Sequence, residues 1–146
     1  VTGVQTCALP ISLDCRGYRL PTDAEWEYAA RAGSTDARQG ELEDTTWYSE
    51  NSEAVTHATG QKQANAWGLY DMLGNVWEWT SDCWAGSYDG APTDGTAVRA
   101  EPCAESPIRG GSWALFPAGV RAANRLKFGR EKLANRLGFR VVRQVR

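Results

Sequence analysis

The sequence is poor in the residues on which many catalytic and metal sites depend. His57 is the single histidine, and none of the four cysteines, Cys7, Cys15, Cys83 and Cys103, belongs to a CxxC pair. A zinc site built from cysteine and histidine is therefore not expected. A catalytic pair of serine or cysteine with histidine would have to use His57, which lies in a polar stretch, so none is predicted.

Long apolar runs are also missing. No stretch approaches the ~20 apolar residues that a membrane-spanning helix needs, so we expect no membrane span. Cys83 and Cys103 flank a loop rich in glycine, proline and aspartate. They either close this loop with a disulfide, which would indicate an oxidising, extracytoplasmic compartment, or remain two reduced thiols. Nothing else in the sequence indicates a localisation.

Acidic and basic residues are nearly equal in number but unevenly distributed along the chain. The formal net charge is −2, yet every acidic residue except Glu131 precedes Arg109, and most basic residues lie from Arg109 onward. The late arginines are interleaved with apolar residues and glycines instead of being clustered on one helical face. We therefore expect them to pair with the acidic first part of the domain, and we predict no nucleic-acid binding.

Tryptophan and glycine are abundant. The 146 residues fit one domain with a sizeable core, and they include seven tryptophans and fifteen glycines. This composition favours a loop-rich fold in which large aromatic side chains fill the gaps between irregular segments.

The first residues differ from the rest. Val1–Ile11 resembles the translation of a sequencing adapter, and we treat it as an artefactual leader that is kept out of the fold argument. Residues 12–146 then form a single domain that is truncated at its N-terminus. Cys7 belongs to the leader and is not counted among the cysteines of this domain.

One helix and several short strands are predicted. Thr22 is a good N-cap, and Glu25 three residues later completes a capping box before a helix over Asp23–Ala32, which Gly33 would end. Alternation predicts a strand over 76–80, with Trp77 and Trp79 on one face. The further predicted strands are Pro107–Trp113, Gly119–Arg125 and Leu137–Arg143, and the predicted loops are Gly33–Asn65, Ala85–Ser106 and Leu126–Arg136.

The stretch Gly68–Asp82 is the most informative. Asp71 and Glu78 bracket a Gly74-Asn75 turn, so their carboxylates could converge on a hard cation such as calcium. The alternative is a buried tryptophan strand with a solvated Glu78. Local spacing alone favours this second interpretation.

Four motifs occur in a fixed order: RLPTDAEWEYAARAG, NAWGLYDMLGNVWEWTSD, RGGSW and LGFRVVR. In these motifs the chain resembles the formylglycine-generating enzyme family, also called the sulfatase-modifying factor family. The resemblance implies an α+β, C-type-lectin-like fold that is loop-rich and low in regular secondary structure. It also implies a further N-terminal portion, in line with the truncation predicted above.

The resemblance makes calcium the favoured interpretation of the turn. Carried onto this sequence, the calcium ligands would be the Asp71 side chain, the Gly74 and Val76 carbonyl oxygens and the Glu78 carboxylate. We expect such an ion to be structural. A second calcium site of the family is not predicted, because the loop that would carry it is short here.

The family's best-known activity oxidises a cysteine of a sulfatase with two active-site cysteines and copper. Counted from Gly110-Gly111-Ser112, the two cysteine positions are Leu115 and Val120 here. Neither side chain provides the thiolate that copper(I) binding and redox exchange require. We therefore predict no catalytic residues and expect no copper.

Three functions follow as hypotheses. We favour a non-catalytic or divergent binding or accessory module whose ligand is a protein, a peptide or a glycan. The alternatives are a formylglycine-generating or other family enzyme whose remaining parts are missing, and a structural paralogue. The oligomeric state is not indicated. The candidate ligand surface mixes aromatic, arginine and amide groups: Trp113, Phe116, Arg121, Asn124, Arg125 and Phe128.

Overall fold

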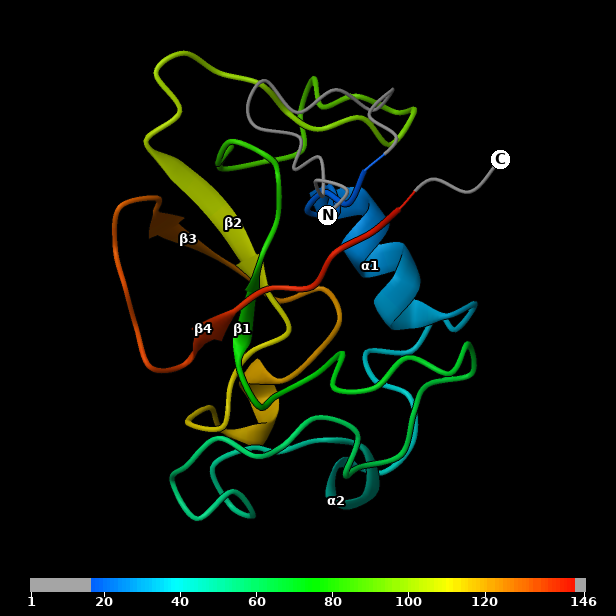
Figure 1. The fold of residues 1–146 in the computed structure, drawn as a ribbon. Helices are drawn as coiled ribbons and strands as arrows, with labels where there is room; N and C mark the ends of the chain where they lie inside the picture. Colours follow the sequence, from blue (N-terminus) through cyan, green and yellow to red (C-terminus); the bar gives the residue numbers. More distant parts are fainter. Residues whose placement is uncertain (1–16, 144–146) are drawn as a thin grey trace, which may run out of the picture.

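A computed structural model describes residues 17–143 (Figure 1). The predictions for the leader Val1–Ile11, for Cys7 and for Cys15 lie outside the described residues. Two helices, one 3-10 turn and four strands make up the regular structure, and the rest is loop. The predicted loop-rich α+β architecture is therefore confirmed.

The first helix, α1 (Asp23–Arg31), begins at the predicted capping box. The Thr22 hydroxyl accepts the Glu25 backbone N–H at 3.1 Å, and the Glu25 carboxylate accepts the Thr22 N–H at 2.8 Å. The helix ends where Ala32 adopts a left-handed conformation with φ 42°. Trp26 and Ala30 lie on its buried face. The capping box is as predicted, and the helix is one residue shorter than predicted.

The sheet is mixed and has the order β3-β2-β1-β4. Strand β1 (Trp77–Trp79) pairs antiparallel with β2 (Glu105–Arg109) and parallel with β4 (Leu137–Gly138), and β2 pairs antiparallel with β3 (Arg125–Gly129). In Figure 1, α1 lies on one side of the sheet, and the segment between β3 and β4 loops outward away from α1. Strands β3 and β4 are the two edges.

Several predicted boundaries are wrong, and the predicted loop Gly33–Asn65 contains the short helix α2 (Leu42–Thr45). The strand predicted over Pro107–Trp113 lies earlier, at β2, so it starts inside the predicted loop. The strand predicted over Gly119–Arg125 is instead the 3-10 turn η1 (Pro117–Gly119) followed by turns. The predicted loop Leu126–Arg136 contains most of β3, and only Leu137–Gly138 of the predicted last strand is a named strand, with an isolated bridge from Val142 to Arg19.

Packing explains the second error. Val120 and Ala122 are buried in the core, and the Asn124 side-chain amide donates to the Gly119 carbonyl at 2.6 Å. This hydrogen bond closes the segment into a turn, so its residues pack against the core instead of pairing with a neighbouring strand. In β3, charged residues alternate with Leu126 and Phe128, which is a strand pattern that the high charge of the segment concealed.

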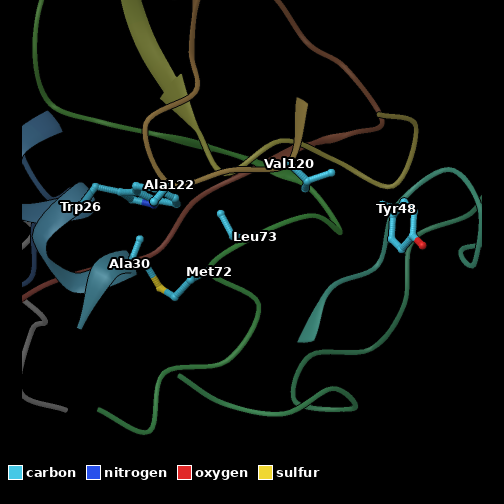
Figure 2. Packing of buried hydrophobic residues seen from close by; sticks show 7 residues of the cluster. All are labelled: Trp26, Ala30, Tyr48, Met72, Leu73, Val120 and Ala122. Carbon is cyan, nitrogen blue, oxygen red and sulfur yellow. The ribbon is translucent and has the colours of Figure 1, made fainter. Parts of the chain in front are cut away.

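The hydrophobic core joins segments that are far apart in sequence (Figure 2). It is formed by residues from α1, from the segment before β1, from the segment after η1 and from the loop after α2 (Leu42–Thr45): Trp26, Ala30, Tyr48, Met72, Leu73, Val120 and Ala122. Within residues 17–143, no helix has the length and apolar character needed to cross a membrane.

Candidate functional site

The GNVWEW turn is fixed by contacts with three other segments. Gly74 has φ 74°, and a Cβ there would stand 2.1 Å from the Trp47 carbonyl oxygen, so only glycine fits. Asn75, also left-handed, donates its backbone N–H to the Trp47 carbonyl at 2.8 Å and accepts the Trp113 N–H at 2.9 Å. Its side chain bonds both the N–H and the carbonyl of His57. The turn is therefore a junction of the fold.

Glu78 is buried, and its carboxylate is occupied by protein donors. Arg140 donates Nε to Oε2 at 2.5 Å and a terminal nitrogen to Oε1 at 2.7 Å, and the Trp26 indole N–H donates to Oε2 at 2.6 Å. The interpretation of Glu78 as a solvated residue is wrong. Its charge is neutralised by a bidentate guanidinium, which is the strong form of carboxylate pairing.

Arg140 lies between two of the predicted calcium ligands, Asp71 and Glu78. Arg140 also donates to the Tyr70 and Asp71 carbonyls at 3.2 Å, so its guanidinium spans the space between Asp71 and Glu78. Asp71 Oδ2 accepts the Gly60 N–H at 2.8 Å. Calcium takes six to eight oxygen ligands, and here a cationic side chain already holds one of the two carboxylates.

As arranged, Glu78 forms an ion pair with Arg140, so a calcium ion would compete with this guanidinium for the carboxylate. Residues 17–143 contain no group of three or more histidine, cysteine, aspartate or glutamate side chains that could hold a metal ion. The predicted set has only two carboxylates and two carbonyls, so that finding does not test it. Calcium at Asp71, Gly74, Val76 and Glu78 stays a prediction.

The two positions carried over from the catalytic cysteines lie together. The Cδ1 atom of Leu115 and the Cγ1 atom of Val120 are each 3.2 Å from the place a Cβ on Gly111 would occupy. Val120 is fully buried, and Leu115 packs against the core cluster. The place where the resemblance puts two thiols is filled by two apolar side chains that contribute to packing.

The predicted ligand surface divides into two groups in the structure. Phe116 is 73 % exposed and Arg121 is exposed, so both are accessible. Asn124 closes the turn described above, and its side chain serves the fold. That the six residues together bind a ligand stays a prediction.

The other members of that surface also have structural partners. Arg125 pairs with Asp23 at 3.2 Å and lies over the rings of Trp84 and Tyr88, with its guanidinium carbon 4.6 and 4.3 Å from their centroids. Phe128 packs edge-on against Trp79, with ring centroids 5.8 Å apart. Trp113 is half-buried.

A buried ionic network connects α1 to β2. Arg109 is fully buried, with its Nε 2.9 Å from Asp23 Oδ1, and it pairs with Glu27 as well. Another of its nitrogens donates to the Asn124 carbonyl at 3.1 Å, and Tyr88 donates its hydroxyl to Asp23 Oδ2 at 3.0 Å. The expected pairing of late arginines with early acids is thus confirmed for Arg109, Arg125 and Arg140, although the partners were not predicted.

The surroundings of two carboxyl groups, Glu27 and Asp82, shift their pKa values. Burial acts to raise the pKa of Glu27, but the hydrogen bonds and charges of Arg31 and Arg109 outweigh it and hold that pKa below its ordinary value. Burial raises the pKa of Asp82, although its carboxylate accepts the backbone N–H groups of Val98 and Asp23.

The cysteines and the histidine have structural contacts. Cys83 and Cys103 lie with sulfurs 2.04 Å apart and Cα atoms 5.4 Å apart, which is disulfide geometry. His57 stacks on Trp47 with ring centroids 3.7 Å apart, and its Nε2 lies 2.9 Å from the Ser52 carbonyl oxygen. The expectation that His57 has no catalytic partner stays a prediction.

The fold and the turn define the class of protein as a lectin-like α+β domain held by the GNVWEW junction. A family model described as a sulfatase-modifying factor enzyme 1-like domain matches residues 4–145. The chain belongs to this family.

Individual relatives agree with that assignment. The chain is 34 % identical to a formylglycine-generating enzyme of Mycobacterium tuberculosis over 86 % of this chain and 51 % of the relative. It is 31 % identical to an inactive C-alpha-formylglycine-generating enzyme 2 of Bos taurus, over 86 % and 44 %. The structure of PvdO from Pseudomonas aeruginosa superposes with a TM-score of 0.83 at 36 % identity, over 89 % and 54 %. The chain thus spans about half the length of the curated relatives it matches.

Proposed function

We propose that this chain is a non-catalytic binding or accessory module of the formylglycine-generating enzyme family. The observation that carries the proposal is the pair of apolar side chains, Leu115 and Val120, at the two positions where the resemblance expects cysteine. Both contribute to packing around Gly111. Oxidation of a substrate cysteine by copper and oxygen needs thiolates at these positions, and an isobutyl and an isopropyl group supply none.

The other sulfur atoms do not replace them in the described part of the chain. Cys83 and Cys103 form a disulfide with each other. Both precede β2 in the sequence, whereas Leu115 follows it. The family also contains inactive members, as the name of the bovine relative states. These points support a module that keeps the scaffold without the catalytic pair.

We propose that the ligand is a polypeptide and that the module binds no nucleic acid. The disulfide favours an extracytoplasmic location, since such bonds persist in oxidising compartments. A formylglycine-generating oxidoreductase is the competing function, because the family itself includes that activity.

A conversion assay separates the two functions. The protein is incubated with a peptide that carries the target cysteine of a sulfatase, together with copper and oxygen, and the peptide mass is followed. The Mycobacterium tuberculosis enzyme serves as the positive control. We expect the peptide to stay unconverted with this protein, and equally so with the Leu115→Ala variant. Conversion of cysteine to formylglycine would overturn the proposal.

A further inference from the structure

The face of the sheet directed away from α1 is mainly apolar; Ile108 and Ser106 are buried on its central strand β2, and Leu126 is exposed on its edge strand β3. The register places Trp79 opposite Ile108, Ile108 opposite Leu126, and Ser106 opposite Phe128. Because successive side chains of a strand point to opposite faces, these residues share the face opposite to that of Glu78 and Arg109. Leu126 is 47 % exposed on it.

A groove of about 360 Å³ continues this face beyond Trp79. Leu133 on its wall is 98 % exposed and Phe139 is 68 % exposed. Clustered exposed apolar side chains of this kind mark interaction sites in soluble proteins. The groove is lined by Trp79, Lys132, Leu133, Ala134, Asn135, Leu137, Gly138 and Phe139.

The groove lies at a free edge of the sheet. Strand β4 is the last strand in the order β3-β2-β1-β4, so no strand of residues 17–143 pairs with its outer side. An exposed strand edge presents unpaired backbone N–H and carbonyl groups, which an extended peptide pairs with when it adds to a sheet. Side chains at alternate positions of such a peptide would then point into the groove.

The rim of the groove is basic. The segment 130–136 contains three basic residues and one acidic residue. Lys132 lines the groove, and Arg136 lies between two lining residues. Within the described chain, neither the Lys132 ammonium nor the Arg136 guanidinium has an ion-pair partner. Unpaired cations beside an apolar groove are complementary to a ligand that combines carboxylates with bulky apolar side chains.

We propose that the β4 edge and its groove bind an extended acidic-apolar peptide, which adds to the sheet as a fifth strand. The backbone of the peptide pairs with β4, its leucine or phenylalanine side chains enter the groove beside Trp79 and Leu133, and its carboxylates meet Lys132 and Arg136. This inference rests on the proposed binding function and names its ligand class and its surface. It moves the ligand site from Phe116 and Arg121 to the opposite end of β3.

The test uses a short blocked peptide in which aspartate alternates with leucine and phenylalanine. A matched peptide has lysine in place of aspartate. Both are titrated calorimetrically into the wild type, Leu133→Ser, and the double charge reversal Lys132→Glu/Arg136→Glu. Val55→Ser and Lys127→Glu are the matched controls, because they remove an exposed apolar residue and reverse an exposed charge outside the groove.

We expect saturable binding of the acidic peptide, at least tenfold weaker binding to both groove variants, unchanged binding to both controls, and slower amide hydrogen exchange in β4. Equal binding of both peptides, no binding by the wild type, or wild-type affinity in the groove variants would overturn the proposal. A dimer that Leu133→Ser abolishes, without peptide binding, would assign the face to a second copy and also overturn it. Formylglycine formation would overturn the proposed function alone, so the two failures are distinguishable.

Discussion

The two faces of the sheet differ in polarity and in solvent exposure. The face toward α1 carries Glu78 and Arg109, which are buried and paired with Arg140, Asp23 and Glu27. The other face carries aromatic and aliphatic residues, of which Leu126 is exposed, and the groove beside this face adds the exposed Leu133 and Phe139. Charged residues are therefore buried and paired on the face toward α1, whereas exposed apolar residues lie at the edge of the other face and in its groove. The difference indicates that the first face holds the fold and the second is available to a partner.

The largest expected effect is on the charged face. Arg109→Ala removes the fully buried partner of Asp23 and Glu27, whose carboxylates then keep only the more exposed Arg125 and Arg31. Breaking a buried ion pair on one side costs about 3–5 kcal/mol. We expect the free energy of unfolding, measured by chemical denaturation, to fall by that amount. Arg121→Ala on the surface is the control, and an equal loss there would contradict the assignment.

The loop that covers this face is expected to contribute slightly less. Cys83 and Cys103 close a segment with a sequence separation of 20 that carries Trp84 and Tyr88 onto Arg125. A cross-link of this span stabilises by about 3 kcal/mol through the unfolded chain. Replacing both cysteines by serine should lower the denaturation midpoint accordingly, and wild type treated with a reductant should match the variant. Identical midpoints with and without reductant would show that the two thiols are not bonded.

Arg140→Gln tests whether calcium competes with Arg140 for the Glu78 carboxylate. Arg140 is partly exposed, so we expect Arg140→Gln to cost about 2 kcal/mol, below the range for fully buried pairs. The variant frees the Glu78 carboxylate, and calcium should then raise its melting temperature more than that of the wild type, since a ligand of the folded state alone stabilises it. If Arg140 alone neutralises Glu78, a chelator leaves the melting temperature of the wild type unchanged. A lower wild-type melting temperature in chelator would instead support the calcium site at Asp71 and Glu78.

Acid should weaken the same face by a smaller amount. The folded-state pKa of Glu27 lies below its ordinary 4.5, so its ion pairs stabilise the fold above that pH. The stabilisation is lost as pH falls through the lowered folded-state pKa. Because Glu27 is partly exposed, we expect a contribution of about 1 kcal/mol. Glu27→Gln should flatten the acid limb of stability against pH, and an unchanged acid limb would show that the pairing is too weak to matter.

The sequence predicted those parts of the fold that depend on local chemistry. The Thr22–Glu25 capping box and the helix after it follow from hydrogen bonds within one turn. The GNVWEW strand follows from alternation. Family motifs then supplied the α+β architecture, which neither periodicity nor composition contains.

Errors arose where tertiary packing decides. Val120 and Ala122 look like strand residues, but they fill the core after a turn that Asn124 closes. The charge of the segment 126–136 concealed β3, although Leu126 and Phe128 alternate with charged residues. Charge distribution predicted that late arginines meet early acids, but only the folded chain shows that Arg140 meets Glu78 and changes the interpretation of the turn.

The measurement that tests the central comparison most directly is the stability of Leu133→Ser. Because Leu133 is 98 % exposed in an apolar groove, we expect its replacement to change the free energy of unfolding by less than about 0.5 kcal/mol, as for an ordinary surface site. In the same protein, affinity for the acidic-apolar peptide should fall at least tenfold. A loss of 2 kcal/mol or more, with peptide affinity unchanged, would show that this side chain packs in the folded protein and that the second face is closed.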